Sequence, residues 1–256
     1  MDKINRKVVI LTDSRGKGLE EILNKSPYID YVVKPRGGHA IMQVTLKGLK
    51  LIENEKPSLV VIFSGITQIT KVIKTCTPWK IILKPKSIRS HVNDFLDDVD
   101  LSKTTIRDHC RDKGITTPKI VFSTIPGADM AKFNKSSTTD HEQDKLNTII
   151  EYINRGIISY NSRSADLFTP FCAKFCHRYK KGRYTNVYKC LKDGLHGNQK
   201  VREQWANEIH FTCIKTLGLS EYIAPQDIKI EINNSGKENS DTDSEYEYDS
   251  NTELDY

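Results

Sequence analysis

The sequence has no apolar run that approaches the length of a membrane-spanning helix, although 37% of its 256 residues are hydrophobic. A helix needs about 20 consecutive apolar residues to cross a bilayer, so a membrane span is not expected. The first seven residues, Met-Asp-Lys-Ile-Asn-Arg-Lys, lack the apolar core of a secretory signal and lead directly into an apolar segment. These absences predict an intracellular, cytoplasmic protein.

Cysteine is sparse, with six residues spread between positions 76 and 213. Without a secretory signal, such cysteines are expected to be reduced thiols and not a disulfide framework. Four potential ligands lie close together, namely Cys172, Cys176, His177 and Cys190. Zinc sites keep regular ligand spacing, and this spacing is irregular, so ordinary thiols are favoured over a zinc site. We expect no metal and no organic cofactor.

The sequence also lacks internal repeats, and its charge is unevenly distributed. Residues 236–256 carry eight acidic side chains against Lys237 alone, a net charge of −7, which leaves +13 on the rest of the chain. A segment so rich in charge and poor in aliphatic residues is typical of disorder. We expect one folded domain over residues 1–222 and a disordered acidic tail over residues 223–256. The oligomeric state is not indicated.

Short apolar segments alternate with amphipathic ones along the folded part. Five strands are expected, at residues 7–11, 31–33, 58–64, 119–123 and 166–169. Helical patterns follow them, around residues 19–23, 41–52, 87–113, 146–157 and 199–213. The alternation predicts an α/β fold: a three-layer, doubly wound, mostly parallel five-stranded sheet with flavodoxin-like strand order. The lysine-rich region 71–87 is expected to form a loop or short hairpin near the mouth of the site.

A serine follows the first expected strand. Residues 12–16 read Thr-Asp-Ser-Arg-Gly and come directly before a helical pattern. Ser14 is therefore expected at the carboxyl end of a strand and the amino end of a helix, where open α/β sheets bind ligands. Unpaired N–H groups at such a helix terminus can stabilise a developing negative charge.

An acidic residue and a histidine precede the last expected helix. The turn Asp193-Gly-Leu-His196 leads to Asn198, a candidate N-cap, and then to an apolar stripe of Val201, Trp205, Ile209 and Cys213. A carboxylate three residues before a histidine can orient the imidazole and fix its tautomer. The alternative interpretation is that Asp193 only caps the turn and His196 only packs.

Four segments of the chain, taken together, resemble the sequence blocks of the SGNH (GDSL-type) hydrolase superfamily over roughly residues 6–217. In chain order they contain Asp13-Ser14, Gly38, Gly65 and the Asp193–His196 turn. The resemblance implies that Ser14 is the nucleophile, His196 the base and Asp193 its orienting carboxylate. It also implies that the backbone N–H groups of Ser14 and Gly38 bind the oxyanion.

Two blocks depart from the family pattern. The first has Thr12 where the family has glycine. The third, which begins at Gly65, has Thr67 where the family has an asparagine that donates to the oxyanion, and Gln68 follows. Either the Thr67 hydroxyl or the Gln68 amide is expected to take over as donor. Loss of one such donor costs on the order of 100- to 1000-fold in turnover, so slow catalysis is expected.

The leading functional hypothesis is a serine ester hydrolase that acts through an acyl-enzyme. The ester is not identified, and a lipid, an acetylated sugar and a small aryl ester all remain open. The alternative is a weak or degenerate module of the same fold that binds RNA or another polyanion through its basic surface. The basic, tyrosine-rich region 171–191 is the candidate surface for substrate or partner. A protein-interaction scaffold that uses the tail is a third hypothesis.

Overall fold

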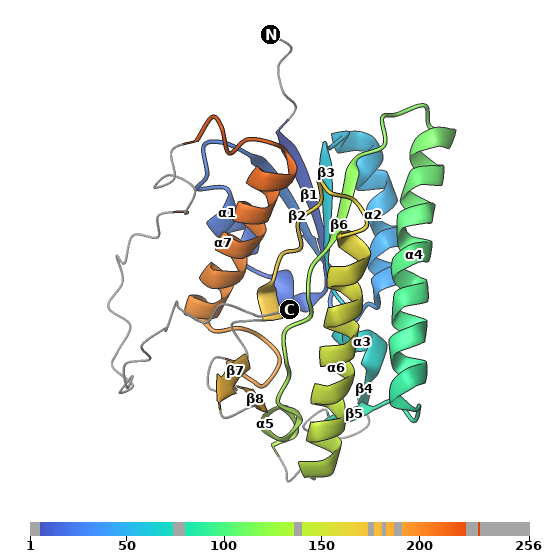
Figure 1. The fold of residues 1–256 in the computed structure, drawn as a ribbon, viewed down its shortest axis with the longest axis vertical. Helices are drawn as coiled ribbons and strands as arrows, with labels where there is room; N and C mark the ends of the chain where they lie inside the picture. Colours follow the sequence, from blue (N-terminus) through green and yellow to red (C-terminus); the bar gives the residue numbers. More distant parts are fainter. Residues whose placement is uncertain are drawn as a thin grey trace.

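The computed structural model describes residues 6–73, 80–135, 140–173, 177–180, 183–186, 191–223 and 230. Its centre is a four-stranded sheet in the order β2-β1-β3-β6, and every pair in it is parallel. The strands are β1 (Lys7–Thr12), β2 (Asp30–Pro35), β3 (Leu59–Phe63) and β6 (Lys119–Phe122). This order confirms the flavodoxin-like arrangement for these four strands (Figure 1).

Burial along the strands follows their place in the sheet. All five residues of β3 are buried, as are the last five of β1, and both strands are rich in β-branched and aliphatic side chains. Edge strand β2 instead alternates between buried and more exposed positions. A central parallel strand is covered on both faces, so a continuous apolar run suits it, whereas an edge strand meets water.

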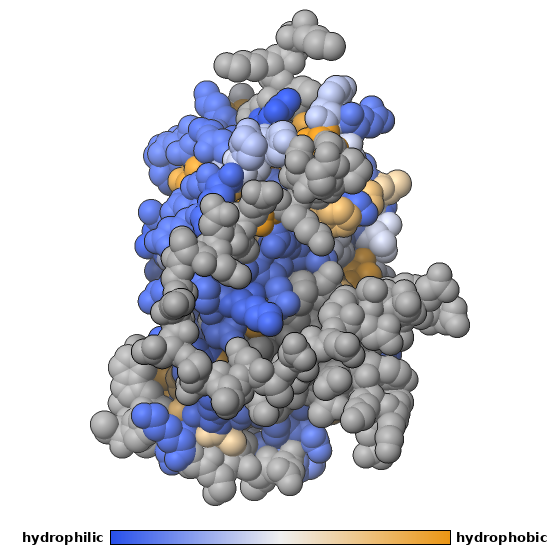
Figure 2. Space-filling model, turned by 90° about the vertical axis from the view of Figure 1, so that its left-hand side faces the viewer, coloured by the Kyte–Doolittle hydropathy of each residue, from blue (hydrophilic) through white to orange (hydrophobic). Residues whose placement is uncertain are grey.

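Helices cover both faces of the sheet, which confirms the three-layer arrangement (Figure 1). One face packs against α1 (Leu19–Leu23) and α7 (Gln199–Thr216). The other face packs against the long helices α2 (Ile41–Glu55), α4 (Ile88–Asp112) and α6 (Asp140–Asn161). Among the described helices, none is long and apolar enough to span a membrane. On the side where α1 and α7 lie, the described surface is mainly hydrophilic (Figure 2).

Short elements surround the carboxyl end of the sheet. They are η1 (Ser14–Gly16), α3 (Ile66–Ile69), α5 (Met130–Asn134), and two antiparallel hairpins, β4 (Thr70–Ile73) with β5 (Lys80–Leu83) and β7 (His177–Lys180) with β8 (Arg183–Asn186). The lysine-rich region thus contains a hairpin. The second hairpin lies in the basic region 171–191, most of whose side chains fall outside the described residues.

The prediction of a fifth strand at residues 166–169 is wrong, because this segment forms no β-ladder with the sheet. Side-chain amides from α6 take the hydrogen-bonding positions beside β6. Asn161 donates to Phe122 O (2.7 Å) and accepts from Phe122 N (3.3 Å). Asn154 pairs with the backbone of Ile125 in the same way. These amides occupy backbone groups that a neighbouring strand would otherwise use.

The packed body continues beyond the expected boundary at residue 222. Ile223 and Ile230 are buried in the core, and Ile230 N donates to Asn207 on α7 (2.9 Å). Of the expected tail over residues 223–256, residues 224–229 and 231–256 lie outside the described residues, as do Cys176 and Cys190 of the potential zinc group. Within the described part, Cys172 is buried, and no group of three metal-ligating side chains occurs there.

Candidate active site

Ser14 lies at the carboxyl end of β1, in a tight turn. Asp13 caps η1, because its Oδ1 accepts from Arg15 N (2.9 Å). The turn also requires glycine at position 16, since a Cβ there would lie 2.1 Å from Thr12 Cγ2. The turn therefore places the Ser14 side chain at the edge where the parallel strands end, as the sequence predicts.

The turn from Asp193 to His196, here called the acid–base turn, is closed by contacts within its own backbone. Leu191 and Gly197 form an isolated bridge, and Lys192 N donates to His196 O (2.7 Å). Gly194 adopts a φ of 88°, and a Cβ on it would lie only 2.3 Å from Asp129 O. The turn is thus docked against the start of α5. The predicted N-cap of α7 is confirmed, because the Asn198 side chain accepts from Val201 N.

The side chains of Ser14, His196 and Asp193 are hydrogen-bonded one to the next, although Ser14 and His196 are 182 residues apart in the sequence. His196 Nε2 lies 2.9 Å from Ser14 Oγ. His196 Nδ1 lies 2.7 Å from Asp193 Oδ2. Since a carboxylate only accepts, Nδ1 carries the proton and Nε2 is free to accept from the serine hydroxyl. This geometry suits proton transfer from Ser14 to His196.

The Asp193 carboxylate is held in its charged form. Partial burial by itself raises its pKa, but the hydrogen bonds from the His196 ring and from the backbone N–H groups of His196 and Leu195 outweigh burial. The net result is a pKa well below the usual range of an aspartate. Asp193 is therefore ionised at neutral pH and can orient and stabilise a protonated imidazole.

The loop over residues 36–40 passes close to Ser14. Its start is fixed by Arg36 N, which donates to Thr12 O (2.7 Å). A Cβ on Gly37 would lie 3.7 Å from Ser14 Cβ, so the loop passes directly beside the serine. Gly38 has a φ of 73°, which favours glycine. Within the described residues, neither Ser14 N nor Gly38 N has a hydrogen-bond acceptor, which leaves two donors for a ligand.

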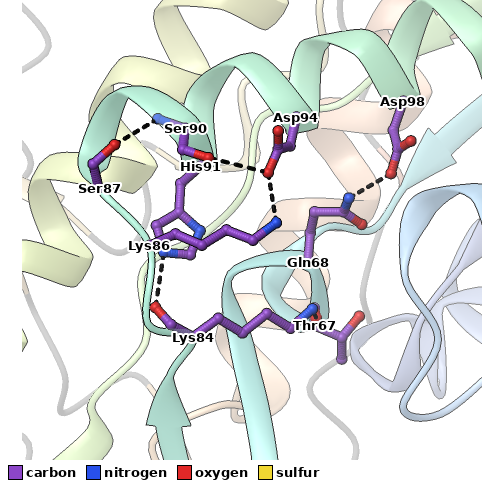
Figure 3. A network of polar contacts seen from close by, with 9 residues as sticks. All are labelled: Thr67, Gln68, Lys84, Lys86, Ser87, Ser90, His91, Asp94 and Asp98. Carbon is purple, nitrogen blue, oxygen red and sulfur yellow. Dashed lines mark hydrogen bonds and ion pairs between the residues drawn. The ribbon is translucent and has the colours of Figure 1, made fainter.

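Thr67 and Gln68 donate their side-chain hydrogen bonds to other groups of the protein. The Thr67 hydroxyl donates to His39 O (2.6 Å) and so supports the loop that carries Gly38. The Gln68 amide donates to Asp98 on α4 (Figure 3). The expectation that the Gln68 amide reaches the oxyanion is therefore not met, because the carboxylate of α4 holds it. Gly65 has a packing reason to be glycine, since a Cβ there would lie 2.5 Å from the Ile125 side chain.

A hydrogen-bonded network fixes this third block against α4 (Figure 3). Lys84 Nζ donates to Thr67 O (2.9 Å), and burial lowers the pKa of this lysine. The carbonyl of Lys84 in turn contacts the His91 ring at 3.1 Å. Lys86 forms an ion pair with Asp94. Both lysines therefore have partners within the protein, Lys84 at a part-buried position and Lys86 at an exposed one.

Arg15 and the segment after β6 were not identified from the sequence. Only 3% of the Arg15 surface is exposed, and its guanidinium donates to Pro126 O (2.9 Å) and Gly127 O (3.4 Å). From the sequence alone, an arginine in a polar turn is expected to face water. Its burial depends on carbonyl groups 111 and 112 residues away, so no local pattern could have revealed it.

Comparisons with known proteins identify the fold. No family model and no curated protein sequence matches the chain. Solved structures do match. A GDSL-like lipase from Bacteroides thetaiotaomicron is 12% identical, with 82% of this chain and 89% of that chain covered and a TM-score of 0.56. A lipase/acylhydrolase from Enterococcus faecalis is 17% identical, with 84% and 96% covered and a TM-score of 0.54. TesA is 13% identical, with 82% and 99% covered and a TM-score of 0.51. The chain therefore has the α/β fold of the SGNH (GDSL-type) hydrolases.

Proposed function

We propose that the protein is a serine hydrolase that cleaves carboxylic esters through an acyl-enzyme. The observation that carries the proposal is the line from Ser14 Oγ through His196 to Asp193, with contacts of 2.9 and 2.7 Å. Two unpaired backbone donors, Ser14 N and Gly38 N, lie in the same region of the described structure. A nucleophile, an oriented base and oxyanion donors are the parts that acyl transfer requires.

In this mechanism Ser14 Oγ attacks the ester carbonyl and His196 Nε2 takes its proton. The carbonyl oxygen becomes an oxyanion, which the N–H groups of Ser14 and Gly38 stabilise. His196 then gives the proton to the departing alcohol, and the acyl group remains on Ser14. His196 then removes a proton from water, which attacks the acyl-enzyme. The bond between the acyl group and Ser14 Oγ breaks, Ser14 Oγ takes the proton from His196, and the acid is released. Asp193 stays ionised throughout and stabilises the positive charge on His196.

The test is covalent labelling of the wild type and of Ser14→Ala by a fluorophosphonate, alongside hydrolysis of a short-chain nitrophenyl ester. We expect the wild type to be labelled slowly, because the Thr67 hydroxyl already donates to His39 O. Ser14→Ala should show neither labelling nor turnover. A wild type that resists labelling while its circular dichroism shows a folded protein would reject the hydrolase proposal.

The second candidate is a module that binds RNA or another polyanion. The net charge of +13 outside residues 236–256 favours it. Against it, Lys84 and Lys86 of the basic hairpin region have internal partners. Binding of a labelled RNA at two salt concentrations tests this function independently of Ser14, because phosphate contacts weaken steeply as salt rises.

A further inference from the structure

We propose that Arg15 is a positioning residue, whose guanidinium determines where Ser14 lies relative to His196. The inference rests on the proposed function, in which these two side chains react together. Arg15 follows Ser14 directly in η1 and is almost fully buried. Because an arginine stays protonated in proteins, its buried charge must be satisfied by fixed acceptors. Its partners are therefore part of how the turn is held.

The guanidinium fastens the serine turn to the segment that follows β6. Nη1 donates to Pro126 O (2.9 Å) and Nη2 to Gly127 O (3.4 Å), so the planar group spans two consecutive carbonyls. At its other end, Arg15 N donates to the Asp13 side chain. Arg15 is thus held at both its backbone and its guanidinium. Ser14 lies in the chain between this fixed residue and β1.

The same segment also holds the acid–base turn. Asp129 N donates to Gly194 O (2.8 Å), and a Cβ on Gly194 would clash with Asp129 O at 2.3 Å. Asp193 precedes Gly194 directly, and His196 follows two residues later. Residues 126–129 therefore contact the turn that carries Ser14, through Arg15, and the acid–base turn, through Gly194. This short bridge fixes the 2.9 Å contact between Ser14 and His196.

The kinetic test compares Arg15→Lys and Arg15→Met with the wild type. A lysine keeps the charge and most of the volume but cannot span two carbonyls, whereas methionine removes all the donors. A displacement of 1 Å can cost about 100-fold in rate, so we expect kcat to fall about 10-fold for lysine and about 100-fold for methionine. KM for a nitrophenyl ester should change by less than about twofold, because the substrate contacts remain.

The matched control is Arg111→Met. Arg111 lies near the end of α4, its side chain is 72% exposed, and it pairs with Asp108 on the same helix. Its loss should leave kcat and KM unchanged. If kcat of both Arg15 variants equals that of the wild type, the inference is overturned. If Arg15→Met does not fold, the smaller change in Arg15→Lys decides the result.

A second readout does not depend on activity. In crystal structures of the Arg15 variants, we expect the distance from Ser14 Oγ to His196 Nε2 to exceed about 3.2 Å, while the contact between His196 and Asp193 is kept. An unchanged Ser14–His196 contact in both variants would overturn the inference, whether or not the wild type cleaves esters. A lengthened contact in variants of a wild type that is inert would support positioning and reject the hydrolase.

Discussion

At position 67 the chain has a hydroxyl where the SGNH pattern has an amide, and in the structure this hydroxyl has a backbone carbonyl as its partner. It donates to His39 O, one residue after Gly38, at 2.6 Å. Ser64 Oγ approaches the same carbonyl more loosely, at 3.4 Å. The threonine therefore supports the loop that contains Gly38, whose N–H is one of the two oxyanion donors in the proposed mechanism.

Because the Thr67 hydroxyl supports this loop, we expect Thr67→Val to slow fluorophosphonate labelling by about 10-fold. The loop loses its main side-chain donor, and Gly38 N is held less firmly. The net loss of one hydrogen bond should lower the free energy of unfolding by only about 1 kcal/mol. Labelling rate and thermal denaturation measure the two effects. Thr67→Ser keeps the hydroxyl and is the control; equal labelling rates for valine and serine would contradict this role.

At the scale of elements, α6 contacts the sheet through asparagines that bond to backbone beyond their own helix. Asn161 satisfies both the N–H and the C=O of Phe122 at the edge of β6. Asn161→Ala leaves two buried backbone groups without this partner, so we expect the free energy of unfolding to fall by about 3 kcal/mol. Urea denaturation measures it. Asn54→Ala, at an exposed position of α2, should change the free energy by less than about 0.5 kcal/mol.

Helix α7 contains a buried histidine that links it to β2. His210 is 1% exposed, and its Nδ1 lies 2.7 Å from the Tyr31 hydroxyl. Burial lowers the pKa of His210 to about 4. In the unfolded chain its pKa is about 6.5, so between these values the unfolded state binds more protons. The stabilisation is complete above pH 6.5 and is lost as the pH falls toward 4.

We therefore expect the free energy of unfolding to fall by about 3 kcal/mol between pH 6.5 and 4 through His210. Burial also lowers the pKa of His91, which adds a loss of the same sign. His210→Gln removes the larger part of this pH dependence, and urea denaturation at pH 7, 5.5 and 4.5 measures it. His141→Gln, at an exposed position of α6, is the control. Parallel pH profiles for the wild type and His210→Gln would refute the assignment.

At the scale of the whole molecule, the sequence was most informative where burial follows a local pattern. The apolar runs of β1 and β3 and the stripe of α7 predicted their elements, and the order of the four blocks predicted which side chains meet. What it missed depends on distant partners. Residues 166–169 look like a strand, but α6 amides take the bonds beside β6, and the burial of Arg15 depends on carbonyls at Pro126 and Gly127.

The side chains of Ser14 and His196 meet in space but lie far apart in the chain. Ser14 is synthesised 182 residues before His196. A nascent polypeptide on the ribosome therefore contains the Ser14 hydroxyl, while the next 182 residues are made, without the imidazole that contacts it in the folded protein. Under the proposed function, turnover would begin only after α7 has emerged and docked, so the onset of activity would report that this helix has packed on the sheet.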